Sequence, residues 1–599
     1  MGFKNILTTL TGFFILSAVL FFQFSEQQWD DKEKIIASDV QGYYGYLPAL
    51  FIHNDLLLEH PEKFNGKIWY LENKDGKRYI KYTCGMAIMY SPFFFTAHAF
   101  AKLLGEKANG YSRPYRFSLS MAAIFYLSLA LVFLSKFLLL YFKDRAVAVT
   151  LLVLFGGTNL WHYYVTDVAL SHGYSFCLLA VFLYCSARWL TEPKIKWALW
   201  ISVSAGLMVL IRPIDIVFLL FLPLFNVSNL KALKERLLLF SKFKMHLLLG
   251  MVLFFLMLLP QLLYYKHVLG SFSVYPYTNE SFFFLNPHLF DSVFSYRNGW
   301  LVYSPLMVFS IIGFLFLGKS LRGSRVFVLG VFCVYFYLIA SWWCWWYVGF
   351  GNRSFINLYP LLSIPLACFV QFVLSKKLPA QILFYTIISV GIVLSVFQSN
   401  QVQKHAMHWG AMTKDAYWET FGKDGATQLF ASYLRYPVTE KALRGIDAVY
   451  SPIYDTVYSL QKSFDKPVPQ DSVFSTFHNR KRSFRGKGAL YIDKENLFSL
   501  QHYVSVTNAN QIYITAWAQN ADGLVLVLSG NDTIPFYSGS EEVCATQNNW
   551  DKIHLYTTLP DNFALDSLYF YVWNKGNKNF WIDELNITAT FCNYVEKTR

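Results

Sequence analysis

The sequence is poor in charged residues and rich in apolar ones. Only 15% of its 599 residues are Asp, Glu, Lys or Arg, whereas a soluble domain usually carries about 25%. The hydrophobic fraction is 55%, and the mean hydropathy is +0.32. The apolar residues come in long runs up to about residue 398, and the remainder has ordinary polarity. This distribution excludes a purely soluble protein and predicts a membrane domain followed by a water-soluble one.

The sequence also lacks the common signatures of metal and nucleotide chemistry. Neither a P-loop nor an HExxH motif occurs, which argues against an ATP-driven pump and a zinc protease. The eight cysteines are scattered, without metal-ligand spacing. Cys544 and Cys592 stand alone in the predicted soluble part, where a disulfide is open in an oxidising compartment and strand pairing can equally keep them apart. We expect no resident cofactor and no metal ligands, with a divalent metal left open.

The net charge of +14 is not a sign of nucleic-acid binding. The lysines and arginines lie mainly in short loops between apolar runs, as the positive-inside rule describes for membrane proteins. We therefore expect membrane lipid, and no nucleic acid, among the partners.

Apolar runs of about 20 residues can cross the hydrocarbon core as helices. Such runs lie near 7–24, 86–104, 117–141, 146–165, 169–187, 197–211, 213–225, 247–268, 300–318, 326–343, 355–374 and 380–398. No small-residue cleavage site follows the first run, so we expect a retained anchor whose N-terminus is cytoplasmic.

Three basic loops predict the orientation. They contain Lys231, Lys234, Arg236, Lys242 and Lys244; Lys319, Arg322 and Arg325; and Lys376 and Lys377. Cytoplasmic positions for these loops put Asp39 and the C-terminus outside the cytoplasm. The number of crossings must then be odd, so we expect about eleven.

One of the twelve runs should therefore fail to cross. Our first choice is 146–165, because its second half begins Gly156-Gly157-Thr158-Asn159. Such irregular backbone is tolerated at membrane depth only where protein or a watery cavity covers it. The short run 213–225, which opens with Pro213, is the second choice.

The tail has a different pattern. Short runs that alternate with period two, such as Ile512-Tyr513-Ile514-Thr515 and Leu568-Tyr569-Phe570-Tyr571, are divided by Gly, Asn and Asp. This pattern is typical of an all-β sandwich. We predict a membrane domain at 1–399, an extracytoplasmic connector at 400–494 and a β-sandwich at 495–599.

Several polar residues lie in or beside the apolar runs, where charge is costly and indicates function by default. Asp39 comes about fifteen residues after the first run and is followed by Tyr43 and Tyr44. The other polar residues singled out are Lys81, Asp167, His172, Arg212 and Arg353. The predicted topology puts Asp39, Lys81, Arg212 and Arg353 on the outer side, where they could share one cavity.

Each of these residues also has a purely structural explanation. Lys81 can extend to the membrane interface, and Arg212 can pair with Asp215. His172 can be a packed, hydrogen-bonded residue. The tryptophans at 342–346 can form an interfacial belt, although a belt does not explain the Gly349-Phe350-Gly351-Asn352-Arg353 segment that follows.

In this order and spacing, the features resemble the integral-membrane glycosyltransferases of the GT-C fold. This group includes the protein O-mannosyltransferases and the lipid A aminoarabinose transferases. The resemblance covers about residues 1–400 and rests on Asp39 in the first outside loop, Lys81 at the second span and the aromatic-Gly-x-Gly-x-Arg element that ends at Arg353. The segment Tyr303-Ser304-Pro305 is similar to one in bacterial members. Two departures, Val40 after Asp39 and Tyr82-Thr83 after Lys81, leave the acceptor class open.

The resemblance implies an inverting sugar transfer at the outer face of a bacterial inner membrane. The donor would be a polyprenyl-phosphate sugar, and the acceptor a glycan, a lipid or a protein. Asp39 would be the general base, and Arg353 would stabilise the leaving phosphate, helped by Lys81 or Arg212. Tyr43, Tyr44, Asp167 and His172 would complete the substrate site.

The final segment, Tyr571-Val572-Trp573-Asn574 followed by Trp581-Ile582-Asp583-Glu584-Leu585, resembles the last strands of carbohydrate-binding jelly rolls. A structural cap without a ligand agrees equally well with this pattern. For the whole chain, the alternative function is a flippase or transporter of lipid-linked sugars with a sugar-binding tail. It predicts repeats with broken helices at matching positions, and we find no such symmetry in the sequence.

Overall fold

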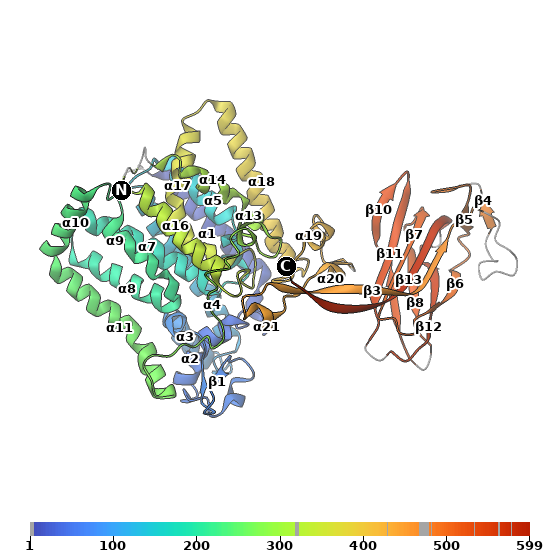
Figure 1. Ribbon diagram of the computed structural model, residues 1–599, viewed down its shortest axis with the longest axis horizontal. Helices are drawn as coiled ribbons and strands as arrows, with labels where there is room; N and C mark the ends of the chain where they lie inside the picture. The colour runs from blue at the N-terminus through green and yellow to red at the C-terminus, as the bar shows by residue number, and fades with distance from the viewer. Residues whose placement is uncertain are drawn as a thin grey trace. The chain divides into compact units, whose positions relative to one another are not determined.

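The computed structural model describes residues 5–317, 321, 323–427, 429–465, 478–480, 482–531, 534–560, 563–576 and 578–598. The chain forms two compact units. The helical unit comprises Met1–Tyr417 and Thr439–Ile446, and the β unit comprises Trp418–Val438 and Asp447–Arg599 (Figure 1). The prediction of a helical N-terminal part and an antiparallel β domain is confirmed at this level.

The helical unit contains many helices of very different length (Figure 1). Its main helices are α1 (Ile6–Glu26), α2 (Asp39–Phe51), α3 (Gly85–Leu103), α4 (Arg113–Leu138), α5 (Asp144–Gly156), α6 (Leu160–Val165), α7 (Ser171–Thr191), α8 (Ile195–Ile211), α9 (Phe221–Leu224), α10 (Leu230–Lys242), α11 (Lys244–Leu269), α13 (Trp300–Tyr303), α14 (Val308–Gly313), α16 (Arg325–Ser341), α17 (Tyr359–Leu374) and α18 (Leu378–Gln403). Short 3₁₀ helices connect some of them: η3 (Pro213–Leu220), η4 (Pro305–Met307) and η5 (Arg353–Leu358).

Six helical segments among the described residues are long and apolar enough to cross a membrane. They are Ile6–Glu26, Arg113–Leu138, Ser171–Thr191, Lys244–Leu269, Arg353–Leu374 and Leu378–Gln403. Shorter apolar helices lie at Ile195–Ile211, Pro213–Leu224 and Arg325–Ser341. Of the basic loops used to predict the orientation, Lys319 and Arg322 lie outside the described residues.

Three of the predicted spans are interrupted. The run 146–165 divides into α5 and α6, and the break falls at residues 157–159, where the glycines and Asn159 had indicated irregular backbone. The run 213–225 begins as the 3₁₀ helix η3, with Pro213 at its first position. The run 300–318 is also divided, since Pro305 separates α13 from α14.

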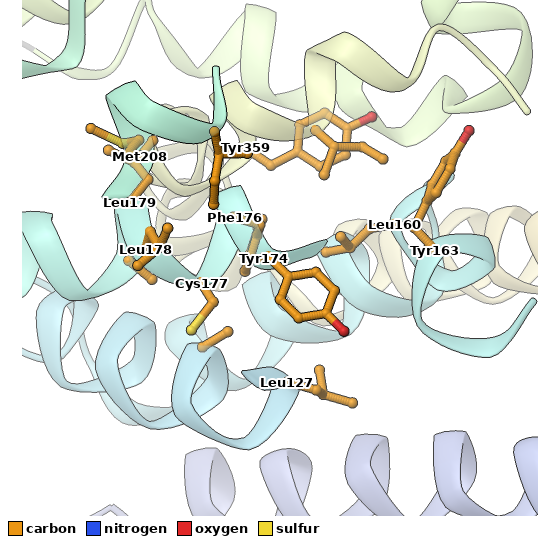
Figure 2. Packing of buried hydrophobic residues seen from close by; sticks show 14 of the residues in the cluster. Leu127, Leu160, Tyr163, Tyr174, Phe176, Cys177, Leu178, Leu179, Met208 and Tyr359 are labelled. Carbon is orange, nitrogen blue, oxygen red and sulfur yellow. The ribbon is translucent and has the colours of Figure 1, made fainter. Parts of the chain in front are cut away.

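The core of the helical unit is built around α7. Its side chains between Tyr174 and Leu179 pack with Leu127 of α4, Met208 of α8 and Tyr359 of α17 (Figure 2). Close backbone approach supports this packing elsewhere in the unit. A Cβ at Gly313 of α14 would lie 1.9 Å from the Pro365 carbonyl oxygen of α17, so only glycine fits there.

The β unit consists of two antiparallel sheets. The larger has the strand order β10-β11-β7-β13-β5-β4, with β3 also paired to β13, and the smaller has the order β6-β12-β8-β9. The strands are β3 (Ala448–Lys462), β4 (His478–Arg480), β5 (Ala489–Ile492), β6 (Phe498–Ser505), β7 (Gln511–Gln519), β8 (Leu524–Ser529), β9 (Tyr537–Ser540), β10 (Val543–Gln547), β11 (Trp550–Thr558), β12 (Ser567–Asn574) and β13 (Phe580–Thr598). One hydrophobic core, which includes Ile514 of the larger sheet and Phe570 of the smaller, joins the two sheets.

Strand β13 organises the larger sheet. It pairs with β5 and β7 and, along most of its length, with β3. Strands β3 and β5 lie at 448–462 and 489–492, within the segment that the sequence had predicted as a connector.

The same strand order keeps the two cysteines of the β unit apart. Cys544 lies on β10 and Cys592 on β13, and β11 and β7 lie between them. Three strand spacings of about 4.8 Å separate them by roughly 14 Å, beyond the reach of a disulfide. The structure accordingly has thiols at both positions, which resolves the alternative in favour of strand pairing.

We predict that residues 447–599 fold alone, whereas residues 495–599 are less stable. The shorter fragment lacks β3, β4 and β5, so much of β13 becomes an unpaired edge that invites aggregation. Thermal unfolding followed by circular dichroism should show a cooperative transition for 447–599 and a lower Tm or aggregation for 495–599. Equal Tm values for the two fragments would show that β3 does not support the fold.

Candidate functional site

Asp39 and Arg353 form an ion pair although 314 residues separate them in the sequence. The Arg353 Nη2 donates to Asp39 Oδ2 at 2.6 Å, and the Tyr82 hydroxyl donates to Oδ1 at 2.9 Å. The side chains of Asp39 and Arg353 are only 16% and 13% exposed. Asp39 is the first residue of α2, and Arg353 is the first residue of η5. The structure thus brings together two of the residues that the sequence had singled out.

Aromatic rings form a wall beside this pair. Tyr43 lies one helical turn after Asp39, and its ring centroid is 4.6 Å from that of Tyr82. A Cβ at Gly42 would lie 2.5 Å from the Tyr82 ring, so this glycine allows Tyr82 to reach Asp39. Burial, together with the charge of Asp39, raises the pKa of Tyr82, which keeps its hydroxyl protonated as a donor. Tyr44 lies elsewhere, because its hydroxyl donates to the Gly110 carbonyl at 2.6 Å.

A second chain of polar groups begins at Arg212. The Arg212 Nη1 is 3.1 Å from His172 Nε2, and His172 Nδ1 is 3.2 Å from Asn357 Oδ1. The Asn357 amide in turn donates to Asp215 at 3.0 Å, and Tyr335 donates to the same carboxylate at 2.6 Å. These contacts require a neutral His172 that accepts at Nε2 and donates at Nδ1. His172 and Asp215 are almost completely buried, so this chain fixes the packing of α7, η3, α16 and η5.

The segment η5 links the two clusters. It carries Arg353, then Ser354, whose hydroxyl accepts from Arg212 at 3.3 Å, and Asn357 one turn later. Arg212 therefore lies beside the Arg353 segment. The direct Arg212–Asp215 pair considered from the sequence is replaced by the bridge through His172 and Asn357.

Lys81 lies in an aromatic box next to Tyr82. Its ammonium forms an ion pair with Glu280 and is 5.5 Å from the ring centroid of Trp69 and 5.1 Å from that of Tyr277. The Lys81 and Glu280 side chains are 10% and 19% exposed. A cation held by a carboxylate and two rings is well compensated. The charge of Lys81 is thus already neutralised in this structure.

Asp167 belongs to a third cluster. Its Oδ2 is 3.2 Å from His162 Nε2, and His162 Nδ1 is 2.9 Å from the Ser399 hydroxyl. His162 lies in α6, directly after the break that follows α5, and Ser399 lies in α18. The irregular segment after Gly156 therefore places a His162–Asp167 pair beside the C-terminal part of α18.

The loop before Arg353 has a backbone conformation that needs glycine at two positions, and side-chain hydrogen bonds to its backbone hold it in place. Gly349 has φ +136° and Gly351 has φ +54°, and a Cβ at Gly351 would lie 2.5 Å from Tyr303. The Asn159 amide donates to the Gly351 and Phe350 carbonyls, and Gly351 N donates to Asn298. The aromatic-Gly-x-Gly-x-Arg pattern is thus a tightly packed loop that positions Arg353.

His408 supports the same loop from the other side. Its Nδ1 accepts from the N–H groups of Gly410 at 3.1 Å and Ala411 at 3.0 Å. This turn presents the Trp409 carbonyl, which accepts from Gly349 N at 3.1 Å and from the Asn298 amide at 2.8 Å. The geometry of the Arg353 loop therefore depends on His408 accepting two hydrogen bonds.

Sequence reasoning missed several members of the site, although weak signals existed for them. Tyr82 follows Lys81 directly, Asn357 lies one helical turn after Arg353, and His162 lies in the irregular segment after Gly156. Glu280 is an acid in the loop between α11 and α13. Its pairing with Lys81 joins segments 199 residues apart, which spacing in the sequence does not reveal.

Among the described residues, no group of three or more His, Cys, Asp and Glu side chains is arranged to hold a metal ion. Comparison of the sequence with protein-family models and with curated proteins finds no match.

We predict that acid destabilises the helical unit through His408. Burial lowers the pKa of His408 from 6.5 to about 4. As the pH falls from 6.5 towards 4, the unfolded state takes up a proton before the folded state does, so stability falls. In His408→Asn, the amide oxygen can still accept the backbone hydrogen bonds but does not titrate. Its Tm, measured in detergent, should fall less steeply over this pH range.

His405→Asn is the matched control, because His405 is exposed and lies three residues earlier. It should keep the pH dependence of the unmodified protein. Identical slopes for His408→Asn and the unmodified protein would contradict the assignment.

Proposed function

We propose that this chain is an inverting membrane glycosyltransferase that moves a sugar from a polyprenyl-phosphate carrier to an acceptor hydroxyl. The observation that carries the proposal is the position of Asp39. Its carboxylate is held by Tyr82 and Arg353 and yet remains 16% exposed. A carboxylate fixed in this way, beside a cation and against aromatic rings, suits a general base that meets a hydroxyl-bearing substrate.

In the proposed reaction, Asp39 takes the proton from the acceptor hydroxyl while its oxygen attacks the anomeric carbon. The bond between that carbon and the phosphate oxygen breaks, and its electron pair stays on the lipid phosphate. Each Asp39 oxygen accepts one hydrogen bond from the described residues, Oδ1 from Tyr82 and Oδ2 from Arg353, which leaves lone pairs for the acceptor. General-base help of this kind contributes about 10²–10⁴-fold to a rate.

Arg353 is the residue best placed to receive the charge that develops on the phosphate. One of its Nη groups binds Asp39, and its Nε is buried without a hydrogen-bond partner among the described residues. A guanidinium with spare donors can bind a phosphate bidentately. Arg212 stands beside the same segment and adds positive charge. Lys81 would have to break its ion pair with Glu280 before it could bind the phosphate. We therefore assign Lys81 a structural role in the wall of the site.

We further propose eleven crossings, with α3 lying along the outer end of the helical unit. Both ends of α3 contact residues at that end. A Cβ at Gly85 would lie 2.7 Å from Ile211, the last residue of α8, and His98 lies 2.5 Å from the Tyr115 hydroxyl near the start of α4. The start of α4 in turn lies at the end of α1, because Arg116 donates to the Trp29 carbonyl at 2.7 Å.

The remaining helices then cross in alternate directions. The eleven crossings are α1, α4, α5 with α6, α7, α8, η3 with α9, α11, α13 with α14, α16, η5 with α17, and α18. This odd number agrees with the parity that the basic loops require. The C-terminal end of α18 lies at the Asp39 end, since Gln403 donates to Thr166, next to Asp167, at 2.8 Å. We therefore propose that Asp39 and the β unit lie outside the cytoplasm of a bacterial inner membrane.

For the β unit, we propose a jelly roll that binds carbohydrate. Two antiparallel sheets share one core, and their neighbouring strands are mostly not consecutive in the sequence. Aromatic side chains gather on the smaller sheet, where the rings of Tyr503 and Tyr569 lie 4.9 Å apart and those of Phe498 and Tyr571 5.6 Å apart. Tyr503 is 67% exposed and Phe498 is 53% exposed. Exposed rings of this kind support stacking against sugar faces.

We predict that Asp39→Asn abolishes transfer without unfolding the protein. The amide keeps the size of the side chain and can still accept from Tyr82, but it cannot take a proton. Single-turnover transfer from a polyprenyl-phosphate sugar should fall by about 10²–10⁴-fold, while the protein still melts cooperatively, at a lower Tm because Arg353 loses its ion pair.

Asp30→Asn is the matched control, because Asp30 pairs with Arg113 at the surface. It should leave transfer unchanged. Near-normal turnover in a well-folded Asp39→Asn protein would remove the catalytic assignment and favour a transport function.

We also predict that Arg353→Lys loses most activity, mainly through weaker binding of the donor. A lysine keeps the charge, but it cannot bind Asp39 and a phosphate with one planar group. The measurement is donor affinity compared with acceptor affinity for the purified variant. Arg78→Lys makes the same change in the surface pair with Glu72 and should have no effect. Full activity in Arg353→Ala would reduce Arg353 to a structural role.

A further inference from the structure

Helix α10 (Leu230–Lys242) lies at the edge of the packed core of the helical unit, against which only its Leu239 and Phe240 pack. None of its residues is buried, although the helix carries several large apolar side chains. Leu230 is 84% exposed, Leu237 57% and Leu238 60%. Exposure of this kind on a short helix marks a surface that contacts another phase or partner.

The exposed leucines and the lysines of α10 share one side of the helix, where Leu230 and Leu237 lie at one edge and Leu238 lies among the lysines. Leu230 and Leu237 are seven residues apart and so lie on one side of the helix. Lys231, Lys234 and Lys242 follow on the adjacent arc, and Lys244 begins α11 two residues later. Glu235 is the single acid of α10. Helices that lie in a membrane interface typically bury leucine side chains in the acyl layer and extend neighbouring lysine side chains to the headgroups.

Polar contacts hold α10 in place at the end of the helical unit. Arg236 donates to the carbonyl oxygens of Leu222 at 2.6 Å and Phe225 at 3.0 Å, at the end of α9. The Asn229 side chain caps α10 by accepting from Ala232 N at 2.9 Å. Arg236 is thus occupied within the protein, whereas the lysine arc points away from these contacts.

The neighbouring helix determines where α10 stands relative to the membrane. Helix α11 (Lys244–Leu269) has the length and apolarity of a span, and at about 1.5 Å per residue it is ~39 Å long. Its far end meets the Asp39 side of the unit, because Gln261 accepts from Cys84 N at 2.7 Å and Tyr264 accepts from Ile80 N at 2.9 Å. Helix α10 therefore lies at the opposite end, directly beside the point where α11 enters the hydrocarbon.

We propose that α10 is a binding surface for anionic phospholipid, with its leucines in the acyl layer and its lysines on the headgroup phosphates. Charge complementarity selects this partner, since the segment Leu230–Lys244 contains four lysines and only one glutamate. A zwitterionic surface would satisfy the leucines but not the lysines. Each lysine near an anionic surface contributes about fivefold to binding. The proposal does not depend on the glycosyltransferase assignment.

The test uses the full chain in nanodiscs of phosphatidylcholine, with or without phosphatidylglycerol. Hydrogen–deuterium exchange of α10 should slow when phosphatidylglycerol is present. In the triple variant Lys231→Gln, Lys234→Gln and Lys242→Gln, this protection should disappear, and the apparent affinity for phosphatidylglycerol should fall about 100-fold. Unchanged exchange in α8 and α11 would show that the variant is folded.

The control variant is Lys376→Gln with Lys377→Gln, which removes charge from the loop between α17 and α18. It should retain the phosphatidylglycerol-dependent protection of α10. An equal loss in the control, or protection of α10 that is the same in phosphatidylcholine alone, would overturn the proposal. A second variant, Leu230→Ser with Leu237→Ser, should weaken protection in both lipids, and full protection in it would likewise contradict the model.

Discussion

The ion pair between Asp39 and Arg353 is the contact on which the rest of the helical unit depends. It joins the segment after α1 to the segment before α17. Burying two charges costs several kcal/mol for each ion unless the pair is well formed and further hydrogen bonds satisfy it. Tyr82 supplies such a bond to Asp39, and the loop before Arg353 is fixed by Asn159 and Asn298. Much of the surrounding structure can be understood as holding these two side chains at contact distance.

The other buried charges follow the same logic. Arg212 and Asp215 are separated by His172 and Asn357, so their opposite charges are joined through neutral groups instead of directly. Lys81 is compensated by Glu280 and aromatic rings. In a unit whose helices are largely apolar, Asp39, Lys81 and Arg212 each have a specific partner among the described residues. The polar residues therefore specify how the ends of α2, α7, α8 and α17 meet, in addition to any chemistry that they perform.

The sequence predicted which parts of the chain are helical and which are β-structure better than it predicted the limits and pairing of individual elements. Apolar runs located nearly every long helix, and the glycines at 156–157 located the break between α5 and α6. The run 86–104 was predicted as a span, but α3 is not among the six described helices that are long and apolar enough to cross a membrane. The β3 strand was missed because it contains Pro452, which an edge strand tolerates but which lowers any strand prediction.

The sequence identified most charged residues of the site but missed several of the residues that pair with them. Asp39 and Arg353 were selected because charge beside an apolar run is costly, and the structure pairs them. Glu280 and His162 were not selected, because their importance follows from contacts across long sequence separations. Tyr44 was grouped with Tyr43 because they are adjacent, but consecutive helical residues point about 100° apart. Only Tyr43 faces Tyr82, while Tyr44 packs towards Gly110.

The Asp39–Arg353 pair also suggests an order of events for the proposed reaction. While Arg353 donates to Asp39, one oxygen of the carboxylate is engaged by the guanidinium. A donor phosphate competes for the same guanidinium, whose Nε is still unpartnered among the described residues. As Arg353 turns its donors towards the phosphate, the Asp39 oxygen that it held is freed to accept from the acceptor hydroxyl. One arginine would thereby couple the arrival of the donor to activation of the acceptor, so that proton abstraction follows donor binding.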